Sequence, residues 1–197
     1  GGAACTAANR IYVQRKVAAE FTQKFAAAMG AFVMGRGRDA GVQLGASVSI
    51  KERNKIAELV DAAVKAGGKI HTGGATPEGD GAFYPATVIS VDKTNDILNH
   101  EVFGPVAPIV TFETDAEAIQ LANSTDFGLI SYVFSKDLTR AIRTAEAIES
   151  GMVAINKGVI SDPAAPFGGV KQSGLGREGG FDGIHEFLET KYIGVEI

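Results

Sequence analysis

The sequence predicts an α/β protein in which helices flank a largely parallel sheet to give three layers. Short apolar, β-branched runs alternate along the chain with amphipathic segments of about 10 to 15 residues, and glycine-rich turns separate them. This order is typical of a layered sheet whose strands are joined by helices. The 197 residues contain no internal repeat or low-complexity linker, and they are enough for one domain with a sizeable core.

The first half of the chain is expected to form two helices and several short strands. Residues 15–33 and 50–66 are expected to be helical, because apolar residues recur there on one face. In the first helix that face carries Val17, Phe21, Phe25 and Met29. Strands are expected at residues 10–14, 69–74, 81–89 and 105–112. Because Pro85 has no N–H to donate, the strand around it is expected at an edge or a bulge.

The second half continues the alternation. Residues 114–125 are expected to form a helix that Thr114 or Asp115 caps, and residues 136–150 a further helix. Strands are expected at residues 129–135, 152–156 and 191–197, with a helix over residues 181–189 before the last of them.

The composition argues against several classes of partner. Asp and Glu outnumber Lys and Arg by 23 to 19, and a net charge of −4 does not suit nucleic acid or an anionic membrane surface. No apolar run reaches the roughly 20 residues that cross a bilayer, and no signal-peptide pattern opens the chain. The three histidines lack the spacing of a metal site. A single cysteine cannot form an internal disulfide, so we expect a cytoplasmic protein.

That cysteine, Cys5, lies in the glycine- and alanine-rich opening GGAACTAANR. A free cysteine is most often a small, buried and inert side chain. The alternative is a nucleophile, since residues 5–9 could form a short helical turn whose backbone dipoles would favour the reactive thiolate. Small neighbouring residues would leave room for a substrate. The residues by themselves leave both interpretations open.

Two further segments attract attention. Glu101 and Phe103 lie in HEVFGPVAPIV, directly before an expected buried strand. Glu101 is either a solvated turn residue or an acceptor for ligand hydroxyl groups, with Phe103 as a flat apolar wall beside the ligand. Residues 166–180, PFGGVKQSGLGREGG, match neither the dinucleotide-binding fingerprint nor the P-loop. Taken alone, this glycine-rich segment is typical of a flexible surface loop.

In this order, GGAACTAANR, EVFGPV and PFGGVKQSGLGREGG resemble the cysteine, cofactor-contact and C-terminal signatures of the aldehyde dehydrogenases. ANSTDFGLISYVFSKDLTRA and ESGMVAIN are also similar to that family, so the resemblance covers nearly the whole chain. The C-terminal segment resembles succinate-semialdehyde dehydrogenases most. Two positions depart from the family pattern: Ala3 replaces a usual glutamine, and Asn99-His100 stands where an acidic residue is common.

The resemblance implies an oxidoreductase that converts succinate semialdehyde to succinate with NAD or NADP. Cys5 would attack the aldehyde carbon to give a thiohemiacetal, hydride would pass to the nicotinamide, and water would hydrolyse the thioester. The N–H of Cys5 would donate to the oxyanion. Glu101 would hold the nicotinamide ribose, and Phe103 would pack near the ring.

The resemblance also implies three residues on the substrate side. Ser161 would hydrogen-bond the distal carboxylate of the substrate, and Phe167 would line the same pocket. Asn156 and the loop after it would approach the aldehyde.

The same resemblance implies that residues 1–197 are a catalytic domain without its N-terminal cofactor-binding domain. The family's general base glutamate and oxyanion asparagine precede the cysteine, so the chain is expected to be inactive alone. Residues 187–197 would form the strand that builds homodimers or homotetramers.

Two alternatives stay open at this point. One is an NAD(P)-dependent dehydrogenase of another small aldehyde, which the residues around Ser161 would distinguish. The other is a non-catalytic assembly module whose C-terminal strand pairs with a sheet edge of another subunit.

Overall fold

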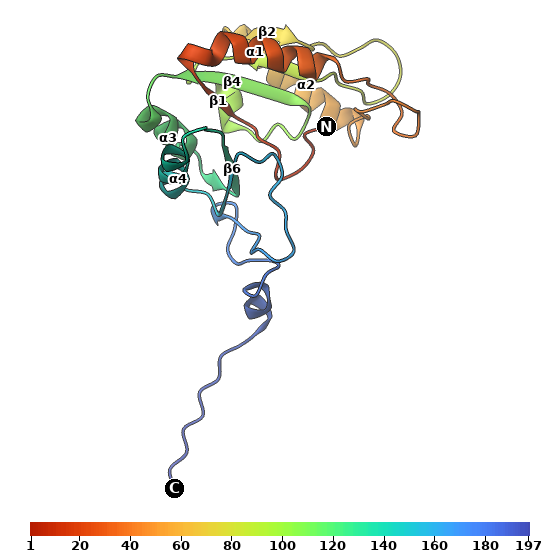
Figure 1. Ribbon diagram of the computed structural model, residues 1–197. Coiled ribbons are helices and arrows are strands. Elements are labelled where there is room, and N and C mark those ends of the chain that lie inside the picture. The colour runs from red at the N-terminus through yellow and green to blue at the C-terminus, as the bar shows by residue number, and fades with distance from the viewer. The chain divides into compact units, whose positions relative to one another are not determined.

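A four-stranded sheet with the strand order β1-β4-β3-β2 forms the centre of residues 1–121 (Figure 1). Its strands are β1 (Ile11–Gln14), β2 (Lys69–Thr72), β3 (Thr87–Ser90) and β4 (Val106–Phe112). β1 and β3 both run parallel to β4, and only β2 is antiparallel to its neighbour. The expected largely parallel sheet is therefore confirmed, with one antiparallel edge strand.

The computed structural model describes residues 1–197 and divides them into two compact units. The N-terminal unit comprises residues 1–121 and the C-terminal unit residues 122–197. No helix in either unit is both long and apolar enough to span a membrane.

In the N-terminal unit, α1 (Arg15–Gly30) and α2 (Ile50–Lys65) contribute to two separate apolar clusters. Successive β4 side chains point to opposite faces of the sheet. Val106 and Val110 therefore join the cluster of α2, whereas Ala107 and Ile109 join that of α1. The arrangement confirms the expected three layers, helix on sheet on helix.

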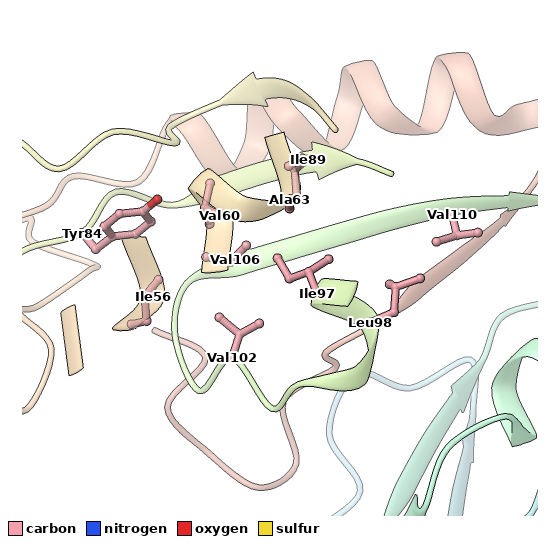
Figure 2. Close-up of a cluster of buried hydrophobic side chains, with 10 residues drawn as sticks. All are labelled: Ile56, Val60, Ala63, Tyr84, Ile89, Ile97, Leu98, Val102, Val106 and Val110. Carbon is pink, nitrogen blue, oxygen red and sulfur yellow. The ribbon is translucent and has the colours of Figure 1, made fainter. Parts of the chain in front are cut away.

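Figure 2 shows the larger cluster, which packs α2 against the sheet. Its buried members are Ile56, Val60, Ala63, Tyr84, Ile89, Ile97, Leu98, Val102, Val106 and Val110. Ile56 and Val60 are 1% and 0% exposed, and burying such a side chain contributes roughly 1.5–3 kcal/mol. Ser49 caps α2 by accepting the N–H of Glu52 at 3.2 Å.

The buried face of α1 differs from the expected one. Ala18 is the buried residue of α1, and Phe25, Ala26 and Met29 are partly buried against the same cluster. Val17 is 50% exposed, so the predicted face is only partly right. The contact therefore combines two alanines with two residues of the predicted face, Phe25 and Met29.

The strand expected around Pro85 is shorter and lies elsewhere in the sheet. β3 begins only at Thr87 and lies between β4 and β2, so it is an interior strand. The prediction of an edge strand was wrong because Pro85 precedes the hydrogen-bonded ladder and removes no donor from it. A short 3-10 helix, η1 (Asp96–Asn99), connects β3 to the segment that precedes β4.

Helix α3 (Asp115–Asn123) follows β4, and the Thr114 hydroxyl caps it by accepting the N–H of Glu117 at 3.2 Å. The remaining elements belong to the C-terminal unit. They are β5 (Phe127–Gly128), β6 (Ile130–Val133), α4 (Leu138–Ala147), β7 (Met152–Ile155), β8 (Val170–Lys171) and η2 (Gly183–Phe187). β6 and β7 are parallel and joined through α4, whereas β5 and β8 are antiparallel.

The end of the chain departs from the expectation. The helix expected over residues 181–189 is the short 3-10 helix η2, and residues 188–197 form neither helix nor strand. The strand predicted at residues 191–197 therefore pairs with no other strand of this chain. Its large apolar side chains are exposed, with Tyr192 at 91%. Pairing with another subunit stays a prediction.

Candidate active site

Cys5 lies in a tight turn before β1. The carbonyl of Ala4 accepts the N–H of Ala7 at 3.0 Å, which places Cys5 inside the turn. The predicted turn is present, as one hydrogen-bonded turn rather than a helix. The thiol is exposed, so the interpretation of Cys5 as a buried inert side chain is wrong for this chain. The Cys5 N–H makes no hydrogen bond within the chain and is available to a ligand oxygen.

Three contacts hold the Cys5 turn against the segment that contains Glu101 and Phe103. The side-chain oxygen of Asn9 accepts the N–H of Val102 at 3.1 Å. The Arg10 guanidinium donates to the carbonyl of Leu98 at 3.1 Å.

The third contact is between two glycine backbones. A Cβ added at Gly2 would overlap the carbonyl of Gly104, and Gly2 also adopts φ +70°, which other residues rarely do. The two segments are far apart in the sequence and adjacent in the fold.

Glu101 and Phe103 face outward on either side of a buried residue. Val102 is 1% exposed and belongs to the α2 cluster, whereas Glu101 is exposed and Phe103 is 42% exposed. Phe103 adopts φ +53°, an uncommon backbone conformation for an aromatic residue. The Glu101 carboxylate accepts no hydrogen bond within the chain. A free carboxylate beside an exposed ring suits the hydroxyl groups and the flat base of a nucleotide.

The neighbouring His100 does not compete for Glu101. Its Nε2 lies 2.9 Å from Oδ2 of Asp96. The pKa of the Asp96 carboxyl is lowered, first by a hydrogen bond from Asn99 and then by the one from His100. Asp96 is thus engaged with His100 and Asn99, and the Glu101 carboxylate remains unpaired.

In the C-terminal unit, Asn156 closes the carboxyl ends of β6 and β7. Its Oδ1 accepts the N–H of Ser135 at 3.0 Å, and its Nδ2 donates to the carbonyl of Ser135 at 2.9 Å. Asn156 has φ +54°, which turns the chain out of β7 into the following loop. Ser135 thus binds both ends of the amide and fixes the side chain. The approach of Asn156 to the aldehyde stays a prediction.

Ser161 and Phe167 lie along that loop. Ser161 is exposed, and its hydroxyl makes no hydrogen bond within the chain. Phe167 is half-buried and pairs with Glu178 through two backbone hydrogen bonds of 2.7 Å. A free hydroxyl and a fixed ring are therefore available on the same loop.

The glycine-rich segment that follows, interpreted from composition as a flexible loop, makes several hydrogen bonds within the C-terminal unit. Arg177 donates from one guanidinium nitrogen to the carbonyls of Gly169 and Gly176, at 2.8 and 2.6 Å. The Ser173 hydroxyl accepts the N–H of Gly128 at 2.9 Å. These bonds fold residues 166–180 onto the C-terminal unit itself.

The structure thus joins the segment of Cys5 to the segment of Glu101 and Phe103 within one unit, and places Asn156, Ser161 and Phe167 along one continuous loop of the other. A single site built from both sets stays a prediction. Sequence reasoning missed Asn9 and Arg177. Asn9 carried a weak signal, because a short amide side chain beside a turn often hydrogen-bonds to backbone groups.

An exposed thiol on a turn that is joined to the segment of Glu101 and Phe103 is a candidate nucleophile site on an α/β scaffold. The chain belongs to the aldehyde dehydrogenase family, whose family model matches residues 1–193. It is 55% identical over 195 residues to a succinate-semialdehyde dehydrogenase of Paenarthrobacter nicotinovorans, covering 98% of this chain and 43% of the relative.

Of two further similar proteins, one is named for a different substrate and one for the same substrate. A glutarate-semialdehyde dehydrogenase of Pseudomonas putida is 44% identical over 196 residues, covering 100% of this chain and 41% of the relative. The crystal structure of succinate-semialdehyde dehydrogenase from Burkholderia pseudomallei matches with a TM-score of 0.92 at 41% identity, covering 94% of this chain and 39% of that one. The chain spans about two fifths of the length of these relatives.

Proposed function

We propose that this chain is the thiol-bearing catalytic domain of an NAD(P)-dependent aldehyde dehydrogenase that oxidises succinate semialdehyde to succinate. The observation that carries the proposal is the exposed Cys5 on a turn whose flanking residues contact Val102 and Gly104, the neighbours of Phe103, in a chain 55% identical to a relative named for that activity. Cys5 is the nucleophile. Whether NAD or NADP is used depends on residues that contact the adenosine ribose.

The chemistry assigned to Cys5 has two halves. The thiolate sulfur attacks the aldehyde carbon, and the carbonyl oxygen becomes an oxyanion that accepts the N–H of Cys5. When bound, the nicotinamide supplies an acceptor for the hydride that leaves this carbon. Water then adds to the thioester on Cys5, the C–S bond breaks, and the thiolate and a carboxylic acid are released.

Glu101 and Phe103 fit the cofactor by their chemistry. A carboxylate without a partner accepts ribose hydroxyl groups, and a half-exposed ring packs against a flat base. Nucleotide binding would therefore use groups that the fold leaves free. The general base and the larger part of the cofactor site are assigned to an N-terminal cofactor-binding domain, so we expect the 197-residue chain alone to be inactive.

The choice of substrate depends on Ser161 and Phe167. Succinate and glutarate semialdehydes, the substrates for which the relatives are named, carry an anionic group at the end away from the aldehyde. The free Ser161 hydroxyl supplies a donor for such a group, and Phe167 lines the methylene chain. A different small aldehyde is the alternative within the same class.

The test of the nucleophile is reduced-cofactor formation by the chain joined to a cofactor-binding domain. Cys5→Ala is expected to abolish turnover while the unfolding curve stays the same, because an exposed side chain contributes little to stability. Turnover by Cys5→Ala would end the proposal. Turnover by the 197-residue chain alone would show instead that it is a complete enzyme.

The test of the substrate uses Ser161→Ala. Its KM for succinate semialdehyde should rise roughly tenfold while its KM for an uncharged aldehyde of equal length stays unchanged, since one hydrogen bond to a charged group is lost. Equal effects on both aldehydes would favour a different substrate.

The assembly module is the second candidate, and one observation favours it. Residues 188–197 expose a row of large apolar side chains and pair with no strand of the chain. We propose that this segment adds to a sheet edge of another copy and builds a homodimer or homotetramer, alongside the catalytic role.

A further inference from the structure

Residues 2–9 around Cys5 and residues 102–104, here called the Phe103 turn, contact each other at two points. Going along the chain, Gly2 and Asn9 flank Cys5, and Val102 and Gly104 flank Phe103. Gly2 packs on Gly104, and Asn9 bonds to Val102. Cys5 therefore lies between two residues that contact the Phe103 turn. Phe103 likewise lies between two residues that contact the Cys5 turn.

Asn9 supplies the polar half of this double anchor. Its Oδ1 lies 3.1 Å from the backbone nitrogen of Val102, which has no other acceptor in the chain. Because Val102 is 1% exposed, water cannot replace that acceptor. Loss of the Asn9 oxygen would leave a buried N–H unpaired next to both Glu101 and Phe103.

The backbone of Phe103 explains why such an anchor is needed. Its φ of +53° is unfavourable for a residue with a side chain and persists only where the flanking residues fix it. Gly104 is fixed by Gly2 on one side and by Ile56 of α2 on the other. Val102 is the remaining flank, and Asn9 holds its N–H.

We propose that Asn9 is a positioning residue: through the Val102 N–H it holds Glu101 and Phe103 in a fixed place relative to the Cys5 nucleophile. The roles of Cys5, Glu101 and Phe103 rest on the proposed function, whereas the anchor itself does not. Arg10 also crosses to this segment but binds Leu98 in η1, before the turn begins.

The first test measures amide hydrogen exchange of Val102 by NMR in the 197-residue chain. Asn9→Leu keeps the size of the side chain and removes the acceptor, so exchange at Val102 should accelerate roughly tenfold, which corresponds to about 1.4 kcal/mol. The matched control is Asn99→Leu, because the Asn99 amide donates to Asp96 and does not accept the Val102 N–H, whose acceptor is Asn9. Unchanged exchange in Asn9→Leu would overturn the proposal.

The second test stays decisive if Asn9→Leu does not fold. Asn9→Asp keeps an oxygen at the same place, so Val102 should stay protected at neutral pH. The introduced carboxyl accepts the N–H, so the Val102 amide resonance should titrate at or below about pH 4, the ordinary range of an aspartate. A resonance that does not move over that range would contradict the contact.

The third test uses the enzyme that carries the cofactor-binding domain. It asks whether Asn9 positions the cofactor-binding residues or only stabilises the fold. Asn9→Leu should raise the KM for the cofactor roughly tenfold with little change in the KM for the aldehyde, and Asn9→Asp should restore it. A fall in kcat with both KM values unchanged would mean that Asn9 is merely structural. If even the parent enzyme oxidises no aldehyde, the proposed function fails, while the exchange and titration results still decide the anchor.

Discussion

Gly2 and Gly104 lie backbone against backbone, and neither position has room for a side chain. A Cβ at Gly2 would overlap the Gly104 carbonyl, and a Cβ at Gly104 would run into the side chain of Ile56. The Cys5 segment, the Phe-Gly-Pro turn and α2 are therefore stacked in direct contact. Glycine at these two positions sets the distance between the thiol-bearing turn and the core.

Gly2→Ala is expected to destabilise the N-terminal unit by about 1–3 kcal/mol, from overlap and from a φ of +70° that alanine adopts poorly. Urea unfolding at constant slope measures the loss. Gly37→Ala is the matched control, since a Cβ there meets no atom within 4 Å. Equal midpoints for the two variants would show that the backbone contact is absent in solution.

Tyr84 is expected to make the stability of the fold depend on pH in the alkaline range. The ring is 1% exposed, and its hydroxyl makes no hydrogen bond of ordinary length. Burial, and then the charge of Asp61, raise the pKa of Tyr84 to about 12 from 10.0. The Thr87 side chain acts in the opposite direction and lowers the pKa of Tyr84.

The sign of the pH effect follows from that shift. Below pH 10 the tyrosine is neutral in both the folded and the unfolded chain, so the stabilising difference is complete. Between pH 10 and about 12 the unfolded chain loses the proton first, and up to about 2–3 kcal/mol of stability should be lost as the pH rises. Tyr84→Phe should remove this loss and raise stability at pH 7 by about 1 kcal/mol.

Urea unfolding at several pH values between 8 and 12 would measure both effects. Tyr192→Phe serves as the control, because that ring is 91% exposed. If the alkaline loss persists unchanged in Tyr84→Phe, another group causes it.

Arg177 is expected to hold the glycine-rich segment in the C-terminal unit. Arg177→Met keeps much of the apolar stem and removes both bonds to Gly169 and Gly176, so the unit should lose about 1–3 kcal/mol. Limited proteolysis should then cut residues 166–180 sooner. Arg143→Met is the control, because Arg143 is exposed and makes no hydrogen bond in the chain. Unchanged proteolysis in Arg177→Met would show that the segment is ordered by other contacts.

The fold could be predicted where local pattern and burial agree. β4 is an apolar run that is buried on both faces over most of its length. Thr114, one of the two predicted caps, precedes α3 and accepts the N–H of Glu117. The face of α1 was predicted only in part, because Ala18 and Ala26 join Phe25 and Met29 in the contact, whereas Val17 stays exposed. Size and spacing alone do not reveal which stripe of a helix approaches a sheet.

The candidate site was predictable only as separate motifs. Cys5, Glu101 and Phe103 were found as members of short segments, but their mutual placement depends on Asn9 and Val102, which are 93 positions apart. No local pattern encodes such a bond. In the same way, the order of the glycine-rich segment depends on Arg177, and composition alone indicated a flexible loop.

The last prediction concerns the C-terminal segment. Leu188 is the last residue whose N–H bonds within the chain, to the carbonyl of His185, so a chain that stops there keeps every contact of η2. Removing residues 189–197 should leave the unfolding midpoint unchanged and take exposed apolar side chains such as Ile193 away. If this segment pairs with another copy, sedimentation should show a dimer or tetramer for the parent chain and a monomer for the shortened one. Replacing Ile193 and Val195 by threonine keeps the length and the β-branching, and should weaken association without abolishing it. An oligomer that survives truncation would place the interface elsewhere, and the exposed tail would then have no role in assembly.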